Sequence, residues 1–293
     1  MKPVRGTSVS GRIFDVCNVL FMIALCATTI YPFLYLLSLS LSPNDASFVE
    51  IRIIPEKFSL VNFQEVLGYE YVATGFFNSV KRTVLGTAMT LAATISAAYV
   101  LSKRYYPHLK LWTMLIVFTM FFQGGMIPSY LLVRGLGLMN SVWALTLPIL
   151  ISAFQLIVAR NFMMSLPEEM EEAAKIDGAN DIYVLWKIVI PVSMPIIATL
   201  GLWNAVNHWN HWFDSLIYMT DRSKDVMQVV MRRIVLQGQL DLMSDLAPHE
   251  VTKTSPETIK AATVMVTTIP IILVYPFLQK YFVKGMLLGS VKG

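Results

Sequence analysis

The chain has 293 residues, of which 55% are hydrophobic and 14% are charged, and its formal net charge is +4. Because soluble domains carry about 25% charged residues, this composition excludes an ordinary soluble protein and indicates one that is mostly embedded in a membrane. The modest positive charge fits membrane topology and contact with anionic lipids, and nothing in it indicates a nucleic-acid partner.

Apolar segments predict six membrane-spanning helices in a single transmembrane domain, residues 1–293. Each segment supplies roughly the 20 apolar residues that a helix needs to cross the hydrocarbon core. The fifth is too long for a straight crossing. The spans lie at about 14–41, 76–101, 109–132, 139–160, 184–219 and 260–283. The sequence therefore predicts an all-α integral membrane protein.

The first apolar segment follows basic residues, as the core of a signal peptide does. It is longer than the roughly 7–15 apolar residues of a cleavable signal, and no clear small-residue cleavage site follows it. We therefore expect the first helix to be retained. Cys17 and Cys26 both lie inside it, where a disulfide has no purpose, so both are expected to be inert packing residues.

The distribution of basic residues predicts the orientation. Lys103, Arg104 and Lys110 crowd one short connection, whereas the longer segment 42–75 carries only two basic residues. Because basic residues gather in short cytoplasmic loops, both termini are predicted to be cytoplasmic. The segments 42–75 and 220–259 then lie outside, the first as a folded loop and the second, with helical character at its start, placed to meet a partner.

The cytoplasmic segment 161–183 carries signals for a short helix. Ser165 and Glu168 have the spacing of a capping box, Pro167 falls in the first turn, and Gly178 suits a left-handed helix end. These signals predict about three turns. A helix this short is marginal alone in water, so it is expected to dock against something.

The same helix carries a small apolar face beside a cluster of acidic residues. Met170, Ala173 and Ala174 recur at i, i+3 and i+4 and make the face shallow. Such a face can enter a basic groove, although a simple solvated loop helix is the alternative. The acidic residues, whose charge the helix dipole favours at this end, are Glu168, Glu169, Glu171 and Glu172.

This segment resembles the cytoplasmic loop of permease subunits of bacterial ATP-binding-cassette importers. That loop reads Glu-Ala-Ala, three residues, Gly, nine residues, Ile-x-Leu-Pro, and this chain departs from it only where Ile190 replaces leucine. Further segments resemble the carbohydrate-uptake branch, which includes the maltose-system permeases. The matching residues are Glu172, Ala173, Ala174, Gly178, Ile188 and Pro191, with Phe77-Asn78-Ser79, Gly137-Leu138-Met139-Asn140-Ser141, Val283-Lys284-Gly285 and Val291-Lys292-Gly293.

The resemblance implies a type I importer (MetI-like) permease of the bacterial inner membrane, without catalytic residues of its own. It implies a second membrane subunit, expected to be a different chain, two ATPase subunits and an extracytoplasmic solute-binding protein. ATP and Mg would lie on the ATPase, in keeping with the absence of a Gly-x-x-x-x-Gly-Lys loop here, so this chain is expected to bind no cofactor. The solute would be a carbohydrate, expected to be an oligosaccharide, with an acidic one such as alginate as a candidate.

In that family the short helix docks into the ATPase, and Glu172 would make an ion pair with it. The coupling residues are then Met170, Glu172, Ala173, Ala174, Asp177 and Gly178. Pro191 and Pro195, spaced i, i+4, are expected to kink the following helix near its inner end and to make it a lever. Ordinary proline tolerance in a spanning helix is the alternative.

The fifth span holds unexpected polar residues. Asn204, Asn207, His208 and His211 follow a helical stripe beside Trp209, a combination of amides, imidazoles and a flat apolar ring that suits a sugar pathway. Hydrogen bonds to neighbouring helices are the competing interpretation. No metal site is expected, because the two histidines lack the helical spacing and the adjacent carboxylate of zinc hydrolases.

Charged residues near the outer side allow two interpretations. Lys81 and Arg82 are expected to snorkel to the membrane interface. With an acidic solute, they are instead expected to steer it together with Arg232 and Arg233.

Two other functions compete with the importer permease. A stand-alone secondary transporter would show related halves and intramembrane ion-coupling residues, of which only Asp214 is visible. A membrane-embedded hydrolase would need a nucleophile with a base, or a metal cluster.

Overall fold

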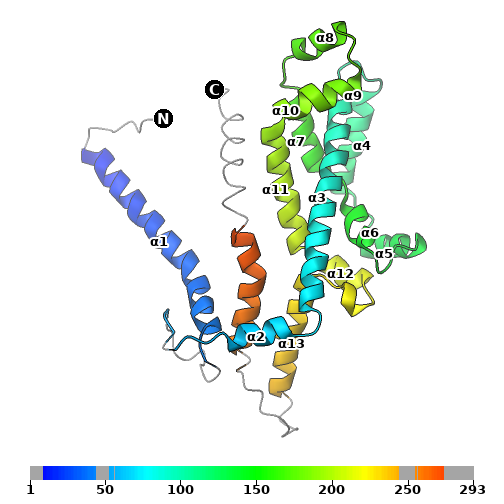
Figure 1. Ribbon diagram of the computed structural model, residues 1–293. Helices are drawn as coiled ribbons and strands as arrows, with labels where there is room; N and C mark the ends of the chain where they lie inside the picture. Colours follow the sequence, from blue (N-terminus) through cyan, green and yellow to red (C-terminus); the bar gives the residue numbers. More distant parts are fainter. Residues whose placement is uncertain (1–8, 44–52, 56, 244–254, 256, 274–293) are drawn as a thin grey trace. The chain divides into compact units, whose positions relative to one another are not determined.

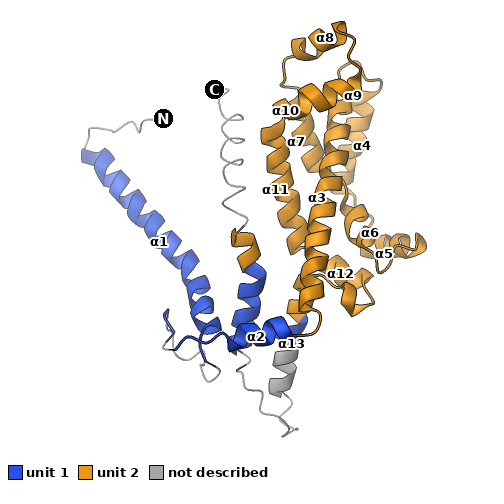
Figure 2. Ribbon diagram, in the orientation of Figure 1, with its two compact units in different colours: residues 1–69, 233–268 blue, residues 70–232, 269–293 orange. Residues whose placement is uncertain are grey.

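The computed structural model describes residues 9–43, 53–55, 57–243, 255 and 257–273, with side chains of 237–243 left aside, and this part of the chain is helical without strands (Figure 1). It divides into two compact units (Figure 2). Unit 1 comprises residues 1–69 and 233–268, and unit 2 comprises 70–232 and 269–293. The expected all-helical architecture is confirmed for the described residues.

Unit 1 contains the first predicted span as the helix α1, Val9–Ser40, whose apolar side chains are mostly exposed, as expected for a helix surrounded by lipid. A short helix, α2 (Val61–Gly68), holds the end of α1: Asn62 Nδ2 donates to the carbonyls of Ser40 at 3.1 Å and Ser42 at 2.8 Å. These bonds satisfy carbonyls that the end of α1 leaves without a helical partner.

The last described helix covers 257–273, of which 257–268 belong to unit 1. It contains the beginning of the predicted span 260–283. The rest of that span and the motif residues 283–293 lie outside the described residues, as do 44–52 and 244–254 of the two predicted outer segments.

Unit 2 is built around α3 (Val72–Ser102), the second predicted span, which packs against α7 (Ala153–Met163) and α11 (Met194–Asn210). Ala98 on α3, Ala159 on α7 and Leu200 on α11 are fully buried in this core. The two alanines let the backbones of α3 and α7 approach closely, which is the usual basis of helix association in membranes.

The other predicted spans are bent. α4 (Leu109–Phe121) and α5 (Met126–Gly135) meet at 111°, so the predicted span at 109–132 is not one straight helix. Gly125, with φ of +83°, lies in the break, where its lack of a Cβ permits the turn. The short helix α6 (Val142–Thr146) with the 3₁₀ turn Leu147–Ile149 meets α7 at 57°.

The fifth span is divided further. α9 (Asp181–Val184), a π-helical turn (Leu185–Val189) and α10 (Ile190–Val192) meet α11 at 82°, and α12 (Phe213–Tyr218) follows α11 after two non-helical residues. Within the described residues, α1 and α3 are each long and apolar enough to cross a membrane, and up to five spans result if each bent pair counts as one.

Candidate functional site

The helix of the 161–183 segment is α8 (Glu169–Ile176), at one end of unit 2 (Figure 1). It has two turns rather than three, and the expected capping box is wrong. The Ser165 hydroxyl donates to the Phe162 carbonyl at 2.7 Å, in the turn that ends α7. In the first turn of α8, the amides of Glu171 and Glu172 donate instead to the backbone carbonyl of Glu168, at 3.0 and 3.1 Å. Ser165 therefore belongs to the end of the preceding helix.

The other end of α8 follows the sequence. Gly178 has φ of +83°, its amide donates to Lys175 O at 3.0 Å, and the Ala179 amide donates to Ala174 O at 2.9 Å. This pair of bonds is the Schellman pattern, in which a left-handed residue closes the helix. The prediction of a glycine-terminated helix at Gly178 is confirmed.

One face of α8 lies against the turn that follows α3. Glu171 pairs with Lys103, Glu168 lies 3.6 Å from Arg104 Nε, and Lys175 Nζ stands 5.4 Å from the centre of the Tyr105 ring. Ala174 packs on the same side, against the buried core of unit 2. Two of the four acidic residues are therefore engaged within the chain.

The rest of the α8 surface is more open, and the exposed Glu172 stands at its edge, where it borders the pocket that α8 forms with Lys103 and Arg104. Glu172, Ala173 and Asp177 are exposed, Met170 is 38% exposed, and Ile176 is 86% exposed. The predicted face of Met170, Ala173 and Ala174 is thus divided, because Ala174 faces the core. An exposed isoleucine beside exposed carboxylates is a surface available to a partner.

A contact behind α8 fixes the following turn. Lys175 Nζ lies 2.9 Å from Asp181 Oδ1, and this hydrogen bond raises the pKa of the Lys175 amine. Asn180 caps α9 by accepting the Tyr183 amide at 2.8 Å. The segment from α8 to α9 is therefore closed by short-range bonds on both sides of Gly178.

The 82° bend lies at Ser193, between Pro191 and Pro195. Neither proline has an amide hydrogen, so the helix loses two bonds around this point. Ser193 has φ of −86° and ψ of 5°, its amide donates to Val189 O at 2.9 Å, and its carbonyl accepts from Ile197 at 3.0 Å. The bend is where the sequence places it, and its use as a lever stays a prediction.

The polar stripe of α11 is split between packing and exposure. Asn204 and His208 are buried, and Asn204 Nδ2 donates to Gln155 Oε1 of α7 at 2.8 Å. Asn207 is exposed and the His211 side chain is partly exposed. The structure therefore places Asn204 and His208 between helices and leaves Asn207 as the exposed residue of the stripe.

His208 lies directly over Gly86 of α3. A Cβ added at Gly86 would stand 2.5 Å from both His208 Cε1 and Nε2. Replacing Gly86 by alanine is expected to force these helices apart and to cost about 1–3 kcal/mol, as overpacking does in cores. Gly201→Ala on α11 is the control, because its Cβ would meet Leu91 Cδ1 at an ordinary 3.4 Å. Denaturation of the purified protein in detergent measures both, and equal stabilities would contradict the expectation.

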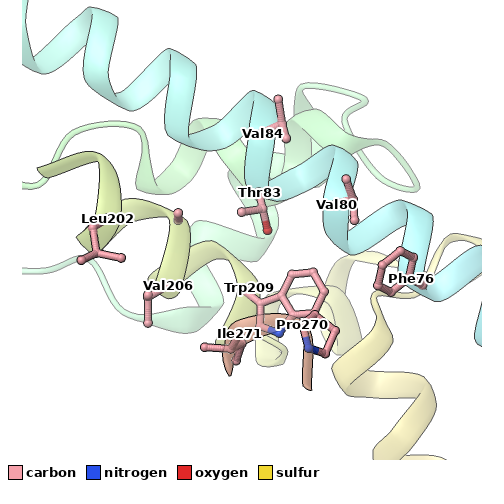
Figure 3. A pocket seen from close by; sticks show the side chains of 10 residues that line it. Phe76, Val80, Thr83, Val84, Leu202, Val206, Trp209, Pro270 and Ile271 are labelled. Atoms are coloured by element: carbon pink, nitrogen blue, oxygen red, sulfur yellow. The ribbon is translucent and has the colours of Figure 1, made fainter. Parts of the chain in front are cut away.

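Trp209 lies in an apolar pocket of about 270 Å³ between α3, α11 and residues 270–271 (Figure 3). Its ring meets Phe76 edge-on at a centroid distance of 6.0 Å. The walls are apolar apart from Thr83, so sugar hydroxyls would find few hydrogen-bond partners here. The lining residues are Phe76, Val80, Thr83, Val84, Leu202, Ala205, Val206, Trp209, Pro270 and Ile271.

The sequence interpretation missed the most buried charge of unit 2. Arg82 has no exposed surface, so the expectation that it snorkels is wrong. Its guanidinium forms an ion pair with Asp214 at the start of α12 and donates to the carbonyls of His211 at 2.6 Å and Leu145 at 3.3 Å. Arg82 and Asp214 are opposite charges within apolar segments, a signal from which the pair could have been predicted.

Residues 219–227 lie near Arg82 at the end of unit 2 away from α8, and they are named here the outer loop because the sequence predicts that 220–259 lies outside. Asn78 Nδ2 donates to the carbonyls of Ser223 at 2.9 Å and Asp225 at 3.0 Å, and Ser79 Oγ accepts the Met227 amide at 2.8 Å. On the other side, Asn140 Oδ1 accepts the Thr220 amide at 2.7 Å. The motif residues Asn78, Ser79 and Asn140 thus fix the loop that precedes α13 (Met227–Met243).

Among the residues that the structure describes, no three His, Cys, Asp or Glu side chains gather in a group that could hold a metal ion.

A family model described as a binding-protein-dependent transport system inner membrane component matches residues 104–288, more than half of the chain. The chain belongs to this family. The permease is therefore a multi-pass transport subunit of the inner membrane and not an enzyme.

The permease is similar to two proteins of Bacillus subtilis along nearly its whole length. It is 43% identical over 291 residues to protein LplC of Bacillus subtilis, over 97% of this chain and 96% of the relative. It is 39% identical to the polygalacturonan/rhamnogalacturonan transport system permease protein YtcP of the same organism, over 97% of this chain and all of the relative.

A solved structure has the same fold. A chain of a bacterial ABC transporter involved in the import of the acidic polysaccharide alginate superposes with a TM-score of 0.85 at 31% identity, over 94% of this chain and 99% of that chain. The permease therefore has the ABC importer permease (MetI-like) fold that the sequence predicts, and the resemblance to ABC importers is confirmed.

Proposed function

We propose that the permease forms half of the translocation pathway of an ATP-driven, binding-protein-dependent importer of a carbohydrate. The observation that carries this proposal is the joint similarity to a permease named for polygalacturonan and rhamnogalacturonan and to an importer of alginate. We extend it to an oligosaccharide, with an acidic one as the first candidate.

The proposed topology has six crossings with both termini in the cytoplasm. Five crossings correspond to α1, α3 and the three bent pairs, and the helix at 257–273 begins the sixth. The α8 end of unit 2 is then cytoplasmic, in keeping with Lys103 and Arg104 in the turn beside it. The outer loop lies on the opposite side of the membrane.

The proposed partners are two ATPase subunits, a second membrane subunit that is a different chain, and an extracytoplasmic solute-binding protein. The exposed face of α8 around Glu172 supports the first of these, because it presents carboxylates and Ile176 to a partner. ATP and Mg would be held by the ATPase subunits, and the permease would bind no cofactor.

The proposed mechanism is alternating access. ATP binding brings the ATPase subunits together, α8 moves with the subunit that holds it, and the membrane helices change from inward-facing to outward-facing. The bend between Pro191 and Pro195 would make α9 and α10 the lever arm that turns α11. Asn207 is our first candidate for solute contact, while Asn204 and His208 serve packing.

The carbohydrate proposal is tested with the complete complex in proteoliposomes, together with its solute-binding protein. Acidic oligosaccharides, such as those of galacturonate and mannuronate, are expected to stimulate ATP hydrolysis and to accumulate inside, whereas neutral oligosaccharides of equal length serve as the control. Stimulation by amino acids or inorganic ions, with none by any carbohydrate, would contradict it.

The rival transport mechanism has one candidate residue, Asp214. Its carboxylate is occupied by Arg82, so it is not available to couple an ion gradient in this conformation. The proposed importer therefore takes its energy from the ATPase subunits.

A further inference from the structure

The turn after α3 holds α8 through three successive residues. Lys103, Arg104 and Tyr105 face Glu171, Glu168 and Lys175 in that order. The partners on α8 are spaced at i, i+3 and i+7, so they share one face of the helix. This arrangement attaches α8 to α3 along most of its length and leaves the exposed Ala173, Ile176 and Asp177 to a partner, with the exposed Glu172 at the edge of the attached face.

The Lys103–Glu171 pair is the most enclosed of these contacts. The two side chains are only 14% and 17% exposed, whereas those of Arg104 and Glu168 are 77% and 71% exposed. Lys103 Nζ also lies 4.1 Å from the centre of the Tyr99 ring on α3, where a cation is attracted to the aromatic face. A pair with little solvent screening couples its two helices more strongly than an exposed pair does.

α3 is unbroken between its two attachments. It runs for 31 residues, about 46 Å at 1.5 Å per residue, while the three bent pairs turn by 57°, 82° and 111°. Near its other end, Asn78, Ser79 and Arg82 hold the outer loop and the start of α12. α3 is thus fixed to α8 at one end and to the outer loop at the other.

We propose that α3 is a second transmission element, which carries the displacement of α8 to the outer loop, with Lys103 and Glu171 as the positioning residues of its inner attachment. This proposal rests on the proposed function, since it needs an ATPase that moves α8. The bent path through Ser193 turns α11, whereas the unbroken α3 transmits displacement along its axis. The two routes together would link ATP hydrolysis to movement of the outer loop.

Charge reversal tests the attachment. In the complete complex, Lys103→Glu and Glu171→Lys are each expected to keep the ATPase subunits bound but to lower the solute transported per ATP hydrolysed by roughly ten-fold. The double variant K103E/E171K restores the pair and is expected to recover most of the loss. Arg104→Glu, which breaks only the exposed pair, is the matched control and should change little.

Three results would overturn the proposal: single variants that transport normally, a double variant no better than the singles, or loss of the ATPase subunits from the single variants. The last would mean that the pair only shapes the docking surface. Failure of the proposed function would appear differently, in an unmodified complex that lacks an ATPase or moves no carbohydrate.

Cross-linking gives a test that does not depend on the charges. Lys103→Cys and Glu171→Cys are introduced together in a chain whose Cys17 and Cys26 are replaced by alanine, and a short bismaleimide joins them. Because we infer that α3 and α8 move as one body, the cross-link should restore the transport per ATP that the two uncharged replacements reduce. Loss of transport only after cross-linking would show that the two helices must separate, and would overturn the proposal.

Discussion

Replacing Arg82 by alanine is expected to destabilise the permease by about 3–5 kcal/mol, because it leaves the Asp214 carboxylate without its partner in a low-dielectric region. The same change removes donors from the carbonyls of His211 and Leu145. The start of α12 and the end of α6 would both lose their attachment to α3. Urea unfolding of the purified protein in detergent, followed by circular dichroism, measures the loss.

Lys81→Ala is the matched control, since Lys81 is the exposed neighbour of Arg82 and its replacement should change stability by less than about 0.5 kcal/mol. The double replacement Arg82→Met with Asp214→Leu should recover much of the loss, because an apolar pair of similar volume leaves no uncompensated charge. Equal stability of the Arg82→Ala and Lys81→Ala variants would show that the pair contributes nothing measurable.

The positions of the apolar segments were predictable because hydrocarbon thickness sets the length of a span. α1 and α3 begin and end within a few residues of their predicted limits. The bends were less predictable. Composition alone does not distinguish a straight crossing from two short helices joined near Gly125, because both bury similar apolar residues and differ only in backbone geometry.

Whether a local motif could be predicted from the sequence depends on how many residues it involves. Gly178 was predictable, because a left-handed helix end depends on one residue and its neighbours. Ser165 was not, because its hydroxyl has two possible partners and the end of α7 takes it. Arg82 depends on Asp214, more than a hundred positions away, so its burial appears only once α3 and α12 are placed together.

The division of α8 into two faces also required the structure. From sequence the four glutamates form one acidic cluster, yet Glu168 and Glu171 form ion pairs with the turn after α3, whereas Glu172 is exposed at the edge of the same pocket and forms no ion pair with the described residues. Two carboxylates of the helix are therefore engaged by its own chain, while Glu172 stays exposed to a partner. This difference allows each role to be tested by the same kind of charge reversal at a different position.

Glu172→Lys is expected to remove the ATPase subunits from the purified complex. The change places a positive charge on the exposed face of α8, where an acidic residue would meet a basic groove, and reversing one member of a docked charge pair should weaken binding by at least about a hundred-fold. Affinity purification through a tag on the permease, followed by quantification of the ATPase, measures the loss. The fold should persist, because the exposed Glu172 side chain forms no hydrogen bond or ion pair among the described residues.

Glu168→Lys is the matched control for this prediction. It makes the same charge reversal on the same helix, but at a position that faces Arg104, and its pair is 71–77% exposed, so the cost to the fold is small. The ATPase should therefore remain bound. If Glu172→Lys leaves an intact complex that hydrolyses ATP and transports, docking does not depend on this face of α8. If both variants lose the ATPase equally, net charge rather than the Glu172 position controls binding.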